Sequence, residues 1–308
     1  MPWSPIAKER PPWMTVRAPS TRSRFGELVD IVREGNLHTV CEEARCPNIG
    51  ECWGRGTATF QIMGETCTRA CRYCAVRSRK VGEDLDLLEP AKVAAAAEKM
   101  GLRHVVVTSV DRDDLPDRGA GHWAQTIRAL RRRNPDVNIE VLVPDFLGFE
   151  EEALQIVLEA GPDVFNHNIE TCRRVQPTVR IKGDYDRALW LLARAKQLWA
   201  ERWPERGTLM TKSGIVAGMG ETDDEVIETM RDLRAHGVDV VTIGQYLQPT
   251  EKHLQLDRWV PLTSFRRFRE EGEKMGFGTV FAGPLVRSSY RAEEQTLAAE
   301  GESRVIAF

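Results

Sequence analysis

The sequence of 308 residues predicts an α/β fold, a partial (β/α)6 barrel with an extension at each end. From Thr57 onward, short β-rich runs alternate with longer segments of helical periodicity. Such regular alternation implies parallel strands with right-handed crossovers, and six units can curl into an open barrel instead of a closed eight-stranded one. Length alone does not distinguish one barrel from two ordinary domains, because it suits both. In a barrel, we expect functional side chains at the C-terminal ends of the strands.

Six runs are predicted as the strands. They are TATFQIM (57–63), HVVVTSV (104–110), NIEVLVP (138–144), DVFNHNIE (163–170), TLMTKSGIVAG (208–218) and VDVVTIGQYL (238–247).

The segments between these runs carry helix signals. In the fourth, apolar residues recur at helical spacing, and they are Ala188, Leu191, Leu192, Ala195 and Leu198. Thr222 and Glu225 form a capping-box pattern for the fifth. The run 131–133 of three arginines ends a helix whose dipole it complements. We therefore divide the chain into an N-terminal arm with a cysteine segment (1–56), the barrel (57–250) and a C-terminal extension (251–308).

The composition is that of a globular protein, with 42% apolar and 29% charged residues. A net charge of -3 gives no global attraction to nucleic acid. The first residues lack the apolar core of a signal peptide and no run is long enough to span a membrane, so we expect a cytoplasmic protein with no membrane or nucleic-acid partner. The first 25 residues, rich in Pro, Arg and Ser, predict an irregular arm lying over a surface.

Six of the seven cysteines crowd into positions 41–74, and the cytoplasm keeps thiols reduced, so metal binding is favoured over disulfides. Cys67, Cys71 and Cys74 lie within eight residues, just after the first strand. A structural zinc site needs four closed ligands, whereas a cubane iron-sulfur cluster held by three cysteines keeps one iron free for another ligand. The alternative is a zinc knuckle that takes a fourth ligand from elsewhere, such as His38.

The spacing of the three cysteines, with Tyr73 before the last, resembles the signature of the radical S-adenosylmethionine superfamily. Upstream, Cys41, Cys46 and Cys52 supply a second triplet at wider spacing, and neither gap is that of a common zinc knuckle. With this triplet, the sequence is similar to the lipoyl synthase family over residues 35–295.

Further blocks carry the resemblance in the family's order: VCEEA, CPN and ECW, then TSVDRDDL, HNIET, TKSGI, GMGET, TIGQYL and GPLVRSSY. Two residues depart from the family's pattern. Arg118 stands where a small or uncharged residue is more usual, and Cys172 stands where Val is usual. A lone cysteine on a buried element most simply packs as a small apolar side chain.

The resemblance implies a sulfurtransferase of lipoate biosynthesis that inserts two sulfur atoms at C6 and C8 of a protein-bound octanoyl-lysine. It implies two [4Fe-4S] clusters: one on Cys67, Cys71 and Cys74 that cleaves S-adenosyl-L-methionine, and an auxiliary one that donates sulfur. It also supplies Ser289, of the RSSY block, as fourth ligand of the auxiliary cluster. A hard serine oxygen on an otherwise sulfur-ligated site should make that iron the easiest to lose.

The implied partners are octanoylated lipoyl carrier domains, namely 2-oxoacid dehydrogenase E2 subunits and the glycine cleavage H protein, with reduced ferredoxin or flavodoxin as electron donor. A basic stretch could steer an acidic partner or could simply be a solvated loop, and it consists of Arg69, Arg72, Arg77, Arg79 and Lys80. Two rivals stay open here: another sulfur-inserting or methylthio-transferring radical enzyme, and a zinc-dependent nucleic-acid-binding protein.

Cofactor contacts are expected at the strand ends. Asn166, Asn168 and Glu170 share one face of the fourth strand by the two-residue period, and such a face must meet something polar, either the cofactor or an internal hydrogen-bond network. We expect cofactor contacts from seven residues, which are Tyr73, Thr108, Ser109, Asn168, Glu170, Arg180 and Lys212. The segment 218–220, Gly-Met-Gly, allows close backbone approach or is only a turn.

Overall fold

The structure is a computed structural model that describes residues 10–15, 24–35, 37–43 and 46–301. Most of the first 25 residues, which were predicted to form an irregular arm, lie outside these ranges. Its described part contains the short 3-10 helix η2 (Pro12–Met14), whose Met14 is fully buried.

One mostly parallel sheet of eight strands forms the centre of the molecule. In spatial order the strands are β1 (His38–Thr39), β2 (Thr57–Ile62), β5 (His104–Ser109), β6 (Asn138–Leu142), β7 (Val164–Asn166), β8 (Met210–Ala217), β9 (Val240–Gln245) and β10 (Thr279–Gly283). Neighbours from β2 to β10 pair in parallel, and only β1 is antiparallel to β2. The α/β class and the six predicted strands are confirmed, and the sheet does not close into a barrel.

The sheet reaches further along the chain than the predicted six strands. Strand β10 falls in the segment predicted as a C-terminal extension, and its five residues, which follow Gly278 and end in Gly283, give too short a pattern to be recognised alone. Strand β7 is also shorter than predicted, because the ladder stops at Asn166 and only an isolated bridge joins Glu170 to Ile215.

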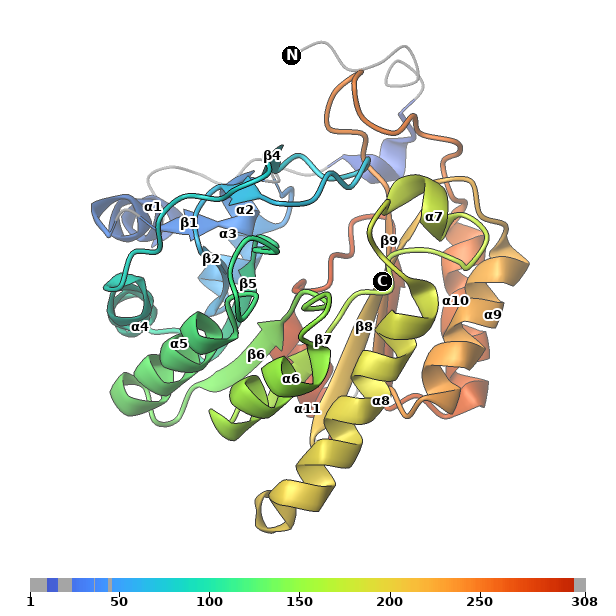
Figure 1. Ribbon diagram of the computed structural model, residues 1–308. Coiled ribbons are helices and arrows are strands. Elements are labelled where there is room, and N and C mark those ends of the chain that lie inside the picture. Colours follow the sequence, from blue (N-terminus) through green and yellow to red (C-terminus); the bar gives the residue numbers. More distant parts are fainter. Residues whose placement is uncertain (1–9, 16–23, 36, 44–45, 302–308) are drawn as a thin grey trace.

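Helices cover the outer face of the curled sheet (Figure 1). The main ones are α1 (Arg24–Glu34), α4 (Glu89–Lys99), α5 (Ala120–Arg133), α6 (Glu150–Glu159), α8 (Tyr185–Arg202), α9 (Asp223–Ala235), α10 (Leu262–Met275) and α11 (Ala292–Ala299). Shorter ones are α2 (Val40–Glu43), α3 (Ile49–Gly54), α7 (Gln176–Val179) and the 3-10 helix η3 (Pro204–Arg206).

The helix signals of the sequence have structural counterparts. The predicted apolar face of α8 is buried, α5 ends on the three arginines, and Thr222 and Glu225 form both bonds of the capping box at the start of α9. Among the described residues, no helix is long and apolar enough to cross a lipid bilayer.

The two free edges of the sheet belong to β1 and β10, the first and last strands of the order. The segment after β10 returns to the other edge, where ion pairs join Arg55 to Glu294 (2.5 Å) and Arg103 to Glu293 (2.7 Å). The C-terminal segment thereby reaches the side of the molecule that carries the first cysteine triplet of the chain.

Candidate functional site

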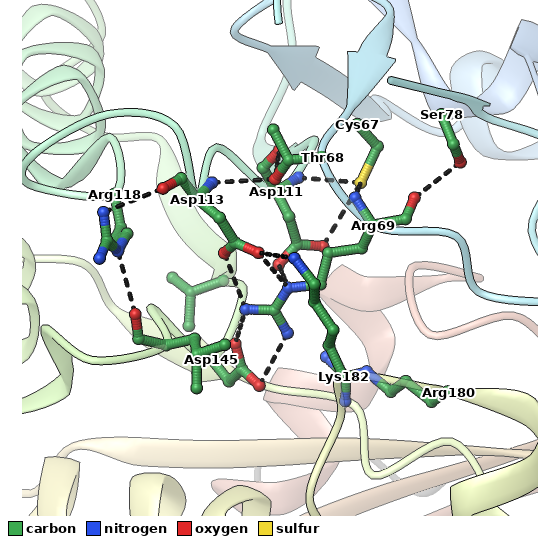
Figure 2. A network of polar contacts seen from close by, with 12 residues as sticks. Cys67, Thr68, Arg69, Ser78, Asp111, Asp113, Arg118, Asp145, Arg180 and Lys182 are labelled. Atoms are coloured by element: carbon green, nitrogen blue, oxygen red, sulfur yellow. Dashed lines mark hydrogen bonds and ion pairs between the residues drawn. The ribbon is translucent and has the colours of Figure 1, made fainter. Parts of the chain in front are cut away.

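The loop with Cys67, Cys71 and Cys74 follows β2, at the end of the sheet where the parallel strands finish (Figures 1 and 2). Two short strands flank it, β3 (Thr66–Cys67) at its start and β4 (Arg77–Ser78) after its last cysteine, and they pair in parallel. Both backbone groups of Arg72 are used: its N–H donates to Val179 O (2.9 Å), and its carbonyl accepts from Leu254 N–H (2.7 Å). Segments far apart in the sequence therefore fix the loop from both sides.

Backbone donors surround the Cys67 sulfur. The N–H groups of Arg69 and Asp111 approach it at 3.4 and 3.3 Å. Burial raises the pKa of the Cys67 and Cys71 thiols to about 12, and it also raises the pKa of Cys74. Since a thiolate is the metal ligand, iron must displace these protons, and the backbone N–H groups can then stabilise the charge on sulfur.

Arg69 anchors this loop to the strand ends (Figure 2). Its guanidinium binds both oxygens of Asp113 at 2.9–3.0 Å and pairs with Asp145 at 2.6 Å, and its side chain is only 2% exposed. Burial alone would raise the pKa of Asp145, but the bonds from Arg69 hold it well below its usual range. The suggestion that Arg69 steers a partner is therefore wrong, because its charge is internal; Arg79 and Lys80 do lie exposed.

Four of the predicted cofactor residues lie together beside the cysteine loop. Burial raises the pKa of Glu170, and the neighbouring Arg180, Asn168 and Tyr73 side chains oppose that rise; Arg180 also donates from Nη1 to Asn168 O (3.2 Å). Arg180 is 7% exposed, so the alternative of a solvent-exposed charge is wrong. Its charge opposes the burial effect on the pKa of Cys71, which places it near the cluster ligands.

Asn166 does not share this site, contrary to the two-residue period expected for the fourth strand. Its Nδ2 donates to Glu140 Oε1 (2.7 Å) inside the sheet. The period fails because the strand ends at Asn166, and Glu170 takes a left-handed backbone conformation (φ 73°).

The other predicted contacts divide between the strand ends and the interior. Ser109 Oγ is buried and has no hydrogen-bond partner among the described residues, whereas Thr108 Oγ1 donates to Leu142 O (3.0 Å). Lys212 lies in the interior, where its Nζ pairs with Glu140 at 2.9 Å. This ion pair occupies the ammonium, so the structure does not bring Lys212 to the cysteine loop.

The turn after β8 is held by Glu221, whose carboxylate accepts from the N–H groups of Gly218 (2.6 Å) and Met219 (3.0 Å). Gly218 has φ 99° and Gly220 φ 117°, conformations that favour glycine. The Gly-Met-Gly segment is thus a tight turn at the end of β8, held by the buried Glu221 carboxylate. The sequence alone did not predict a role for Glu221.

A second site brings the other three cysteines to the C-terminal segment. One cavity is lined by ten residues, which are Cys41, Cys46, Asn48, Ile49, Cys52, Thr57, Thr59, Arg287, Ser289 and Tyr290. Ser289 thus faces the same space as cysteines more than 230 positions earlier in the chain. Among the described residues, no three His, Cys, Asp or Glu side chains converge as the ligands of one ion do, so the thiols surround a space and not a point.

Direct contacts hold the two halves of this cavity together. Asn48 Nδ2 donates to Leu285 O (2.6 Å), and Glu51 accepts from Tyr290 (3.1 Å) and from Arg291 (2.6 Å). Gly244, at the end of β9, makes room for the incoming segment: a Cβ there would lie 2.0 Å from Val286 O. The sequence block TIGQYL therefore includes a glycine that lets the RSSY segment dock.

The chemistry of this donor set suits a cluster with three sulfur ligands and one oxygen ligand. Burial raises the pKa of Cys41 to about 11 and of Cys52 to about 12, and it also raises that of Cys46. As at the first site, the thiols need a metal cation to become thiolates.

Arg118 and Cys172, the two departures from the family pattern, have separate surroundings. Arg118 donates to the carbonyls of Asp113 (3.0 Å), Leu115 (2.6 Å) and Leu147 (3.0 Å), and so joins the loops after β5 and β6. Cys172 packs in a small apolar cluster beside the cysteine loop, as a filler would.

The family model described as Radical SAM superfamily matches residues 62–251. A lipoyl synthase of Rubrobacter xylanophilus is 53% identical over 287 residues, covering 93% of this chain and 86% of the relative. The lipoyl synthase of Thermus thermophilus is 50% identical over 296 residues, covering 96% and 89%.

Among solved structures, methylornithine synthase (PylB) superposes with a TM-score of 0.51 at 14% identity, covering 81% of this chain and 77% of that one. SuiB of Streptococcus suis, bound to S-adenosylmethionine, gives a TM-score of 0.52 at 11% identity, covering 80% and 57%. At such identities these structures support the fold alone.

Proposed function

The chain belongs to the lipoyl synthase family of the radical S-adenosylmethionine superfamily, and we propose that it divides the two halves of that reaction between its two cysteine triplets. It inserts sulfur at C6 and C8 of a protein-bound octanoyl-lysine to give the lipoyl group. The observation that carries the proposal is the cavity that joins Cys41, Cys46 and Cys52 to Ser289. A radical generator alone would not need this second donor set.

Cys67, Cys71 and Cys74 would hold the radical-generating cluster, which, when loaded, supplies the electron that cleaves S-adenosylmethionine to an adenosyl radical. The protein's contribution here is position. Arg69 fixes the loop against the strand ends, and the paired Arg72 backbone fixes its middle. Three cysteine ligands leave one iron free to take the cofactor.

The cofactor would lie against the strand ends beside this loop. Glu170 and Asn168 offer acceptors for ribose hydroxyls, and Ser109 Oγ offers a buried hydroxyl with no other described partner. Arg180 would pair with the methionyl carboxylate, since its hydrogen bond to Asn168 O uses only one of five N–H donors. Thr108 and Tyr73 would border the bound cofactor, whereas Lys212 would not, because Glu140 holds its ammonium in the interior.

The auxiliary cluster is the sulfur-donating substrate. Cys41, Cys46 and Cys52 would bind three of its irons, and Ser289 would bind the fourth through a harder oxygen, which makes that corner the weakest. The protein substrate is an octanoylated lipoyl carrier domain. We further propose carriers of the 2-oxoacid dehydrogenase and glycine cleavage systems, reduction by ferredoxin or flavodoxin, and a cytoplasmic location.

The decisive experiment is mass spectrometry of an octanoylated lipoyl-domain peptide after anaerobic incubation with enzyme, reductant and S-adenosylmethionine. We expect a product that carries two additional sulfur atoms, made by protein that binds about eight irons per chain. Unmodified peptide, or protein that holds about four irons or stoichiometric zinc, would contradict the two-cluster reading.

A further inference from the structure

Arg287 stands in the wall of the auxiliary cavity, next to the ligand segment but outside the ligand set. It follows Val286, whose carbonyl presses against Gly244, and its Nη1 would lie 3.2 Å from a Cβ at that glycine. The backbone at Gly244 thus fixes the start of the side chain, and the guanidinium is held at the cavity.

No carboxylate pairs with Arg287 within the described part of the chain. Its Nη1 donates to the carbonyl of its own neighbour, Val286 (2.7 Å). The other arginines of this region differ, because Arg55, Arg103 and Arg291 each bind a glutamate. The side chain is half-buried, and the Cys46 sulfur on the cavity wall is near enough to interact with its charge.

A half-buried cation at a cavity wall is stabilised by a negative partner, because even partial removal of a charge from water without compensation is costly. Among the described residues that line the cavity, the three cysteines and Tyr290 are the most acidic groups, and the Ser289 hydroxyl would become anionic only as a metal ligand. When three thiolates and an alkoxide hold a cubane core, their negative charge exceeds the positive charge of that core. The cluster with its four ligands would therefore supply the negative partner of Arg287.

We propose that Arg287 is the counter-charge of the auxiliary cluster, facing the Cys46 side of the cavity and stabilising the cluster until its sulfur is used. This inference rests on the proposed function. It adds a residue that touches the sulfur donor without ligating iron. A guanidinium suits the task because it stays protonated and can donate several hydrogen bonds to sulfur at once.

The test uses the sign of the effect in two states of the full chain. In the iron-free protein, Arg287→Met removes a half-buried cation that binds no carboxylate of the described residues, so the urea midpoint should rise or stay unchanged. In the loaded protein the same change should release auxiliary iron to a chelator at least tenfold faster. A residue with a purely structural role would lower the stability of both states.

The auxiliary cluster can be observed alone in a Cys71→Ala background, which removes a ligand of the other cluster. There, Arg287→Met should lower the reduction potential of the auxiliary cluster, because a nearby cation favours uptake of an electron. Arg287→Lys keeps the charge and should lie between the parent and the methionine variant. Arg103→Met, which removes an exposed arginine paired to Glu293, is the matched control and should leave iron release and potential unchanged.

Parent-like iron release and potential in Arg287→Met would overturn the proposal, as would a lower urea midpoint of the iron-free variant. Failure of the underlying function is distinguishable, since the parent itself would then bind about four irons per chain instead of about eight.

Discussion

The buried ion pair between Lys212 and Glu140 offers a quantitative test of how the interior is stabilised. Lys212 Nζ lies 2.9 and 3.0 Å from the two carboxylate oxygens, and the two side chains are 2% and 0% exposed. The Glu140 carboxylate also accepts a hydrogen bond from Asn166 Nδ2 (2.7 Å) and lies 3.2 Å from His104 Nε2. We consider the change Lys212→Met, which keeps the length and removes the charge.

The variant leaves the Glu140 carboxylate buried without its cation. Removing one partner of a buried pair costs about 3–5 kcal/mol in the free energy of unfolding. For a chain of this size that loss corresponds to a fall in Tm on the order of 10 °C. Neutralising the remaining partner should recover much of it, so Lys212→Met combined with Glu140→Gln should lose less than about 2 kcal/mol.

The assay is urea unfolding of the iron-free protein, so that metal binding does not alter the apparent stability. The pH dependence has a definite sign. Burial would raise the pKa of Glu140, but Lys212 and His104 lower it from 4.5 to about 2. The contribution of the pair is therefore complete above pH 4.5 and disappears as the pH falls through about 2.

The difference in the free energy of unfolding between the parent and Lys212→Met should shrink as the pH falls from 4.5 to about 2. The reason is that the unpaired Glu140 of the variant becomes neutral more readily. If the losses of the two single variants simply add in the double variant, or if the gap is the same at pH 7 and pH 3, the ion pair does not stabilise the interior as described.

Three further predictions concern the sites. Cys71→Ala should abolish formation of 5'-deoxyadenosine, whereas Cys46→Ala should still form it and yield no sulfur-containing product; any lipoyl product from Cys46→Ala contradicts the donor role. Ser289→Cys should retain iron and cleave the cofactor but insert sulfur far less than the parent in single-turnover mass spectrometry, while Ser288→Cys should match the parent; full lipoyl yield from Ser289→Cys would show that the weak corner is unnecessary. Arg118→Ala removes three hydrogen bonds to carbonyls and should cost about 1–3 kcal/mol in urea unfolding, and an unchanged midpoint would deny it the role of joining two loops.

The sequence predicts those features whose cause is local. The strands β2, β5, β6, β8 and β9 are apolar runs long enough to be recognised, and the triplet Cys67, Cys71 and Cys74 is contained in one loop. The pairing of Thr222 with Glu225 is likewise set within one helical turn. For such features, residue spacing already carries the geometry.

Residue spacing does not predict positions that depend on how the strands pair with one another. Lys212 was expected at the cofactor because it sits in a strand near the predicted site, but its position along β8 places it opposite Asn166 in β7, in the interior. Only the register between strands determines that depth. Arg69 was counted with the exposed basic residues because its acidic partners, Asp113 and Asp145, follow two other strands.

Ser289 is the extreme case, because family resemblance predicted it and local sequence did not. Its approach to Cys52 depends on β10 as the final strand of the sheet and on the absence of a side chain at Gly244. By itself, the sequence Arg-Ser-Ser-Tyr is indistinguishable from an ordinary polar turn before a helix. The signal that could have found Arg287 is of the same kind, a charge whose partner appears only in three dimensions.

The open barrel gives these distant contacts a common purpose. Its edges, β1 and β10, do not pair, and the auxiliary cavity draws residues from both sides of that opening. A donor cluster that bridged the opening alone would release the ligand segments when its sulfur was used. The bonds of Glu51 to Tyr290 and Arg291 do not pass through iron, so they hold the two sides together independently of the cluster. Because these contacts are direct, we expect the four proposed ligand positions to stay assembled while the auxiliary cluster is consumed.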